Sequence, residues 1–260
     1  MLKNRFIKFF TALILSIFSL NSFANAEVRI VQVTFVGNLG SGKTYFRKAV
    51  CGEKFSDIYL SESHTTNTEF QNVTIPFSDD NLKQLQIKCF DTSGDSDIKS
   101  QIIDHRVKDS HFVVITVDST KSVKKGAYYT YKDITDQNMR KWYDLITEKY
   151  PECFVILLGT KTDTLSRQIE PGMKESKYAC FERKLVNISN QEKETISHVM
   201  GAITARGYSG VNEFFEIIKE RIREINLYGH LPSIDDESGN LGDYNGMQKQ
   251  AHPKKWCTLQ

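Results

Sequence analysis

Hydrophobic and polar positions divide the chain into short apolar runs separated by longer segments with helical periodicity. Runs rich in β-branched residues and bounded by polar turns are typical of strands, and continuous apolar runs are typical of strands covered on both faces. Two of the runs are joined only by a polar turn, which predicts a hairpin over residues 72–90. Strands are predicted at residues 28–36, 72–77, 85–90, 112–117, 153–158 and 199–203.

Two segments have apolar residues at the spacing of one helix face. Helices are predicted at residues 136–150, with Met139, Trp142, Tyr143 and Ile146 on one side, and at residues 211–225, with Phe214, Phe215, Ile218, Ile222 and Ile225 on one side. The alternation of strands and helices predicts an α/β fold with a doubly wound, mostly parallel six-stranded sheet and helices on both faces. Such folds bind ligands at the carboxyl ends of their strands.

The two ends of the chain differ from this central domain, for which we predict residues 27–228. Residues 1–26 have a basic start, an apolar run and a final Ala24-Asn25-Ala26, the layout of a signal peptide. An uncleaved membrane anchor is the alternative. Residues 229–260 are polar and contain Pro232 and several glycines, so we expect a flexible tail. Within the domain, the charged stretches 121–136 and 164–195 are expected to be surface insertions.

Composition excludes some classes of function. The 260 residues are 40% hydrophobic and 25% charged, which is ordinary for a globular protein with one good core. The formal net charge is +2 and no long basic stripe is present, so we expect no binding of nucleic acid. We also expect a monomer. The five cysteines include no CxxC pair, which argues against a disulfide framework or a zinc site.

The chemistry is concentrated first in residues 37–44, Gly-Asn-Leu-Gly-Ser-Gly-Lys-Thr, which match the phosphate-binding pattern G-x-x-x-x-G-K-[ST] between a predicted strand and a helix. Glycines let the backbone approach a phosphate closely, and the helix N-terminus adds partial positive charge. Lys43 is expected to reach the outer phosphates and the Thr44 hydroxyl to ligate Mg²⁺. The phosphate-binding residues are Gly37, Leu39, Gly40, Ser41, Gly42, Lys43 and Thr44.

Three further strand ends carry polar residues. Asp91 follows the third predicted strand, where it can hold Mg²⁺, and Gly94 can offer its N–H to a γ-phosphate. Asp163, in Gly159-Thr160-Lys161-Thr162-Asp163, can accept two hydrogen bonds from the N1–H and N2–H₂ edge of guanine, which adenine lacks. The last strand runs into Thr204-Ala205-Arg206, where a backbone N–H could meet the guanine O6.

This ordered set of motifs resembles the Ras superfamily of small GTPases over roughly residues 28–225. The resemblance implies a P-loop NTPase fold that binds GTP or GDP with Mg²⁺. It implies that Asp91 and Gly94 begin the switch II motif and that Thr160, Lys161 and Asp163 form the [NT]KxD element. Thr204, Ala205 and Arg206 then correspond to the SAK element.

The resemblance also concerns the loop before the second strand. Residues 65–70 are similar to the switch I stretch of Rab proteins, which implies that Thr65 ligates Mg²⁺ in the GTP state. Phe55 fits the aromatic that packs across guanine. The threonine of residues 160–163 and the long gap before Thr204 resemble Rho proteins instead, so no subfamily is assigned. The implied partners are effector proteins, an exchange factor and a GTPase-activating protein.

Two departures from the family pattern concern hydrolysis. Asp95 stands where the family has a water-positioning glutamine, and Leu39 stands where a glycine is common. A carboxylate cannot donate the amide hydrogen bond, and a branched side chain at Leu39 crowds the space that an arginine finger enters. The expected catalytic set is Lys43, Thr65, Gly94 and Asp95, with slow hydrolysis because the missing contributions are large.

The chain ends in Cys257-Thr258-Leu259-Gln260, a C-a-a-X pattern that favours farnesylation of Cys257. A signal peptide and a prenyl group conflict, because an exported chain does not meet a cytosolic prenyltransferase. Export of the protein by a bacterium into a eukaryotic host, followed by lipidation and peripheral binding to a host membrane, reconciles them.

Three functional interpretations remain open from the sequence alone. The first is a GTP-dependent switch with weak hydrolysis that recruits effectors at a membrane. The second is a hydrolysis-deficient pseudo-GTPase that titrates regulators or effectors of other GTPases. The third is a P-loop kinase acting on a small molecule, which gives no reason for Asp163 or the Thr204 element.

Overall fold

Six strands form one mixed sheet at the centre of the computed structural model, which describes residues 26–53, 69–78, 82–92, 106–131, 137–195, 199–204 and 210–234. The strand order is β2-β3-β1-β4-β7-β8, and every neighbouring pair is parallel except β2 and β3. The predicted hairpin and the predicted mostly parallel sheet are therefore confirmed. The strands are β1 (Glu27–Gly37), β2 (Glu69–Pro76), β3 (Lys83–Asp91), β4 (Phe112–Asp118), β7 (Phe154–Thr160) and β8 (Val199–Thr204).

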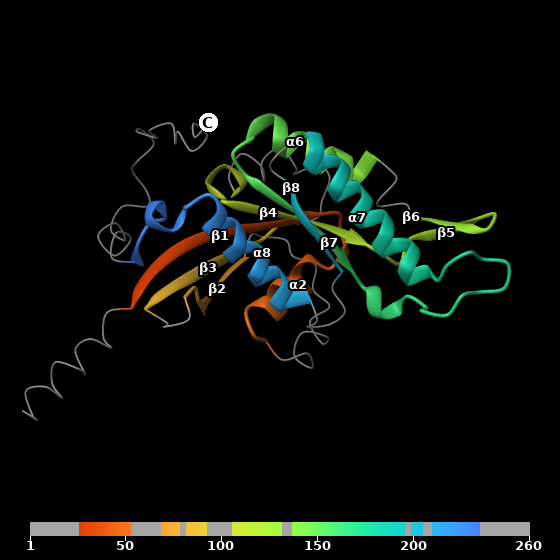
Figure 1. Cartoon of the computed structure of the whole chain (residues 1–260), viewed down its shortest axis with the longest axis horizontal. Helices are drawn as coiled ribbons and strands as arrows, with labels where there is room; N and C mark the ends of the chain where they lie inside the picture. The colour runs from red at the N-terminus through yellow and green to blue at the C-terminus, as the bar shows by residue number, and fades with distance from the viewer. Residues whose placement is uncertain are drawn as a thin grey trace, which may run out of the picture.

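Helices cover both faces of this sheet (Figure 1). On one face, α2 (Lys43–Val50) and α8 (Val211–Glu224) pack together, and the rings of Phe46 and Phe214 lie 5.8 Å apart. On the other face, α6 (Gln137–Lys149) buries Trp142 and Ile146, as the sequence predicts. Successive residues of β4 and β7 point to opposite faces, which is why both strands are continuous apolar runs.

One expected surface insertion, residues 164–195, contains a core helix instead. Helix α7 (Lys177–Thr195) lies beside α6 and fully buries Cys180, Phe181 and Leu185. A Cβ atom on Gly159 of β7 would lie 2.4 Å from Cε1 of Phe181, so the helix packs directly on the strand backbone. The prediction was wrong because the few apolar residues of this amphipathic helix are surrounded by charged ones.

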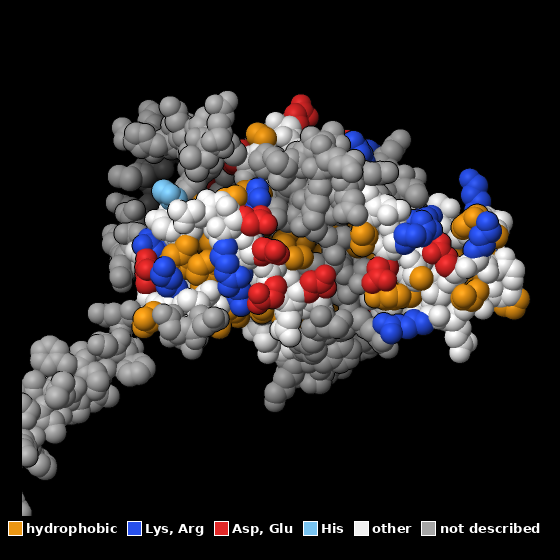
Figure 2. All heavy atoms as spheres, in the orientation of Figure 1, with side chains coloured by type: hydrophobic (Ala, Val, Ile, Leu, Met, Phe, Trp, Pro, Cys, Tyr) orange, Lys and Arg blue, Asp and Glu red, His pale blue; other side chains and the backbone are white. Residues whose placement is uncertain are grey.

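The other expected insertion, residues 121–136, forms a hairpin of β5 (Ser122–Lys125) and β6 (Tyr128–Tyr131), and residues 132–136 lie outside the described part of the chain. Its inner face buries Tyr129 and Tyr131, and the Tyr131 ring lies 5.1 Å from that of Phe181. Its outer strand is exposed, as expected, and Figure 2 shows basic side chains among apolar ones at this hairpin, whose own basic residues are lysines.

The segment after α8 packs against the start of β1 rather than leaving the fold at Tyr228. Leu231 is buried, the Ile30 N–H donates to the Pro232 carbonyl at 2.8 Å, and Arg29 and Ser233 form an antiparallel bridge. Residues 229–234 therefore belong to the fold and not to the predicted flexible tail. A stretch rich in glycine and proline has no periodicity from which this docking could have been read. Residues 1–25 and 235–260, with Cys257, lie outside the described residues.

Short 3-10 turns lie at Val107–Asp109 (η2), Thr162–Thr164 (η3) and Tyr228–His230 (η5). Within the described ranges, no helix is both long and apolar enough to cross a lipid bilayer.

Candidate functional site

The turn between β1 and α2 has a backbone that only glycine tolerates. Gly37, Gly40 and Gly42 have φ values of +145°, +70° and +90°. A Cβ atom on Gly37 would lie 2.3 Å from Oγ1 of Thr116, and one on Gly42 would lie 3.1 Å from the Thr160 Cβ. A turn of this kind, placed before a helix N-terminus, directs successive backbone N–H groups toward one point and can hold an anionic phosphate.

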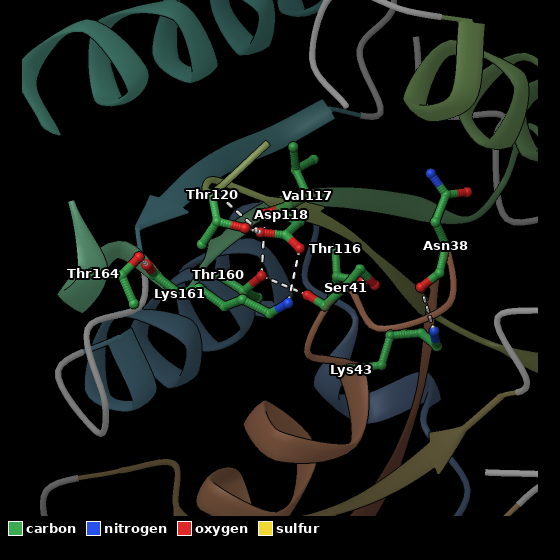
Figure 3. A network of polar contacts seen from close by, with 10 residues as sticks. All are labelled: Asn38, Ser41, Lys43, Thr116, Val117, Asp118, Thr120, Thr160, Lys161 and Thr164. Carbon is green, nitrogen blue, oxygen red and sulfur yellow. Dashed lines mark hydrogen bonds and ion pairs between the residues drawn. The ribbon is translucent and has the colours of Figure 1, made fainter. Parts of the chain in front are cut away.

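Hydroxyl groups from two other strands fix this loop in place. Ser41 and Thr116 share a buried hydrogen bond of 2.5 Å between their hydroxyl oxygens, and the Thr116 hydroxyl donates to the Val36 carbonyl at 3.1 Å. The Thr160 hydroxyl donates to the Ser41 carbonyl at 2.5 Å (Figure 3). The ends of β1, β4 and β7 are thereby joined through the loop, so its shape is set before any ligand arrives.

Lys43 bends back over its own loop. Its Nζ donates to the carbonyls of Gly37 at 3.1 Å and Asn38 at 3.0 Å, and the side chain is buried (Figure 3). Burial lowers the pKa of Lys43 to about 8, although the nearby Asp91 carboxylate opposes that shift. The ammonium group is thus positioned at the loop into which a phosphate would bind.

Asp91 and Thr44 form the oxygen-rich part of the site. Burial raises the pKa of Asp91, while a hydrogen bond from the Thr44 side chain and the charges of Arg47 and Lys43 act in the opposite direction. A carboxylate beside a hydroxyl is a donor set that suits Mg²⁺, which keeps several waters and binds phosphate oxygens as well. The described residues contain no cluster of three or more His, Cys, Asp or Glu, and Thr65, the other expected Mg²⁺ ligand, lies outside them.

Arg47 is a residue of the site that the sequence predictions missed. Its side chain is buried, with Nε 3.7 Å from Oδ2 of Asp91 and Nη1 donating to Oε1 of Gln71 at 2.5 Å. Arg47 lies four positions after Lys43, so both side chains project from the same face of α2. That spacing is the one signal by which the sequence could have indicated it.

A second polar cluster lies where β4 and β7 end. Lys161, with a φ of +58°, places its Nζ 2.8 Å from Oδ2 of Asp118, and Oδ1 of Asp118 accepts hydrogen bonds from the N–H and hydroxyl of Thr120 (Figure 3). Burial alone would raise the pKa of Asp118, but the hydrogen bonds from Lys161 and Thr120 outweigh it and lower that pKa. Asp118 was not predicted either, although an aspartate that ends an apolar strand is a visible signal.

Most of the predicted binding residues meet at this edge of the sheet. The structure brings together Gly37, Leu39, Gly40, Ser41, Gly42, Lys43, Thr44, Asp91, Thr160 and Lys161. Asp163 follows on η3 with an exposed side chain, and Thr204 ends β8 beside Gly159 of β7. Predicted residues that lie outside the described ranges are Phe55, Thr65, Gly94, Asp95, Ala205 and Arg206.

A family model described as "Ras of Complex, Roc, domain of DAPkinase" matches residues 32–163, just over half of the chain. The chain belongs to the Roc family of Ras-type GTPase domains. The matched range runs from β1 to η3 and includes the phosphate loop, Asp91 and residues 160–163. The resemblance to the Ras superfamily and the P-loop NTPase fold are therefore confirmed.

Two further comparisons agree with a Roc domain. The chain is 25% identical over 95 residues to mouse Ras-related protein Rab-33A, covering 36% of this chain and 38% of that protein. It also matches the structure of a bacterial selenocysteine-specific elongation factor, EF-Sec, with a TM-score of 0.51, 15% identity, and coverage of 75% of this chain and 29% of that one. The second match shows the fold alone. Ras-like domains bind guanine nucleotides, usually with Mg²⁺, and typically hydrolyse GTP.

Proposed function

We propose that this Roc domain is a GTP-binding molecular switch with weak intrinsic hydrolysis that recruits effector proteins. The observation that supports it most is the convergence of three elements at one edge of the sheet: the glycine loop with Lys43, the Thr44–Asp91 pair, and residues 160–163. The hydrogen bond from the Thr160 hydroxyl to the Ser41 carbonyl joins the phosphate loop to the end of β7, which leads into residues 160–163. A nucleotide bound there would contact both at once.

Guanine selectivity is assigned to Asp163 and is tested first. Purified full-length protein is expected to bind a fluorescent GDP analogue in competition with GDP and GTP but not with ADP or ATP. An Asp163→Asn variant is expected to lose guanine affinity by on the order of tenfold or more, because a charged acceptor of two hydrogen bonds is lost. Equal competition by adenine nucleotides would reject the proposal.

Switching rests on the two segments that flank strands β2 and β3. Thr65 lies before β2 and Gly94 after β3, and both are proposed to bind only when the γ-phosphate is present. Hydrogen exchange is expected to slow in residues 54–68 and 93–105 when a GTP analogue replaces GDP. Equal exchange in the two forms would contradict a switch and favour a locked binding module.

An aromatic pair with one exposed and one partly buried ring lies between those two segments in the sequence. Phe70 on the edge strand β2 is 63% exposed, and its ring lies 6.0 Å from that of Phe90 on β3. Exposed aromatic side chains are typical of protein-binding surfaces. Because β2 and β3 adjoin both nucleotide-sensing segments, this pair is the surface proposed to contact effectors.

Weak hydrolysis is attributed to Asp95 and Leu39. Leu39 is 53% exposed on the phosphate loop, so its branched side chain is not packed into the core and is available to crowd the space that an arginine finger enters. Single-turnover GTP hydrolysis is expected to be slow in the wild type and to rise by on the order of tenfold or more in Asp95→Gln, which restores an amide donor. Asp109→Gln, a matched change at an exposed aspartate of η2, is the control and is expected to have no effect. Fast wild-type turnover would rule out this assignment.

The cellular location is a separate part of the proposal. Cleavage after Ala26, followed by prenylation of Cys257 in a host cell, would place the mature protein on a host membrane. Mass spectrometry of protein recovered from such cells is expected to show both changes. A chain that begins at Met1 or keeps a free Cys257 thiol would contradict it.

A further inference from the structure

A buried arginine stands beside the proposed metal carboxylate. Arg47 projects from α2, and its side chain is 2% exposed, while that of Asp91 is fully buried. The Nε of Arg47 lies 3.7 Å from Oδ2 of Asp91, which is an ion-pair contact longer than a hydrogen bond between those atoms. The guanidinium therefore supplies a positive charge to Asp91 without the short bidentate geometry that makes such a pair strongly stabilising.

A chain of hydrogen bonds holds the guanidinium from its other side. Its Nη1 donates to Oε1 of Gln71 on β2, and Nε2 of Gln71 donates to Oε1 of Glu53 at 2.7 Å. Glu53 in turn pairs with Lys48 of α2 at 3.7 Å. The cation is thus fixed by two strands and one helix, so it stays beside Asp91 whether or not a metal ion is bound.

We propose that Arg47 is a positioning residue for the nucleotide site: a resident cation that shares Asp91 with Mg²⁺ and makes nucleotide retention less dependent on Mg²⁺. This inference rests on the proposed binding of guanine nucleotides. With Mg²⁺ bound, the guanidinium would lower the affinity of Asp91 for the cation. Without Mg²⁺, the guanidinium would still balance the Asp91 charge, so the carboxylate would repel the phosphates less. Both effects reduce the coupling between metal and nucleotide.

The experiment measures release of a fluorescent GDP analogue from the full-length protein, once with Mg²⁺ and once with excess chelator. The quantity compared is the release rate with chelator divided by the release rate with Mg²⁺. Arg47→Leu is expected to raise this ratio by on the order of tenfold, since it removes one unit charge 3.7 Å from the carboxylate that would hold the metal, in a medium of effective dielectric constant of about 20. The same variant is expected to need less Mg²⁺ for half-maximal slowing of release.

Two further variants separate the charge of Arg47 from its packing. Arg140→Leu removes the same charge from an exposed site on α6, where Arg140 pairs with Asp144 rather than Asp91, and its ratio is expected to equal that of the wild type. Arg47→Lys keeps the charge with a smaller side chain and is expected to restore most of the wild-type ratio, which a purely structural role would not do. Arg47→Lys also carries the test if Arg47→Leu does not fold, because a tenfold rise there would contradict the proposal.

The outcomes distinguish this inference from the function it rests on. If the wild type binds no guanine nucleotide, the proposed function fails and this inference fails with it. If all variants bind the GDP analogue and Arg47→Leu has the wild-type ratio of release rates, only the role of Arg47 is overturned.

Discussion

Two ion pairs at the same edge of the sheet contrast in how much water reaches them. Arg47 and Asp91 are 2% and 0% exposed and lie 3.7 Å apart, whereas Lys161 and Asp118 are 39% and 3% exposed and lie 2.8 Å apart. In the first pair, both charges are almost completely removed from water, yet their contact is long. In the second pair, the Lys161 side chain stays partly in water and the contact is short. A buried pair of this kind contributes little to stability, yet removing one partner is costly because the other charge remains buried.

The buried pair gives the largest expected effect. Asp91→Ala leaves the Arg47 charge buried beside a cavity, and we expect a loss of about 3–5 kcal/mol in the free energy of unfolding. Urea unfolding without added nucleotide or Mg²⁺ measures it, so that ligand linkage does not contribute. The double variant Arg47→Leu with Asp91→Leu is expected to recover most of the loss. If the unfolding free energy of Asp91→Ala lies within about 1 kcal/mol of the wild-type value, the buried pair does not differ from the more exposed pairs in the way proposed.

Breaking the partly exposed pair of Lys161 and Asp118 is expected to lower the free energy of unfolding by less. Asp118→Asn keeps an acceptor for Thr120 but removes the ion pair with Lys161, at a cost of about 1–2 kcal/mol. Because the pKa of Asp118 is lowered in the folded protein, its contribution is present above the unfolded pKa and is lost as pH falls through the folded value. The stability gap between wild type and variant is thus expected to narrow below pH 3.8, the ordinary aspartate value. A gap that widens on acidification would contradict the lowered pKa.

An exposed ion pair on α6 is expected to contribute the least to the free energy of unfolding. Arg140 and Asp144 are 60% and 57% exposed at 3.2 Å. Arg140→Gln is expected to change the unfolding free energy by no more than about 0.5 kcal/mol, with the difference vanishing at high salt. A loss comparable to that of Asp118→Asn would show that exposure does not order these pairs.

The same contrast separates what could be predicted from the sequence from what could not. The glycine loop, Lys43 and residues 160–163 are local patterns, and the structure places them together at one edge. Arg47 has no local pattern beyond its spacing of four positions from Lys43, because its burial depends on Gln71 and Asp91, which come from strands much later in the chain. A charged residue inside an amphipathic helix is usually solvated, so only the tertiary neighbours show the difference.

Packing shows a similar division. Strands β4 and β7 are buried throughout and mostly apolar, and they were predicted nearly to the residue. Helix α7 was missed because three buried side chains among many charged ones give a weak periodic signal. The docking of Leu231 against the start of β1 was missed because it depends on the position of another strand rather than on a pattern within residues 229–234.

The docking of residues 229–234 against the start of β1 determines where the two ends of the described chain lie relative to the phosphate loop. The bridge between Arg29 and Ser233 brings the first and last described segments to one pole of the domain (Figure 1). The phosphate loop follows the far end of β1, and eleven residues of extended strand separate it from that pole by roughly 30 Å. A linker attached at either end would therefore leave the proposed nucleotide-binding edge of the sheet facing away from the surface to which the linker is attached.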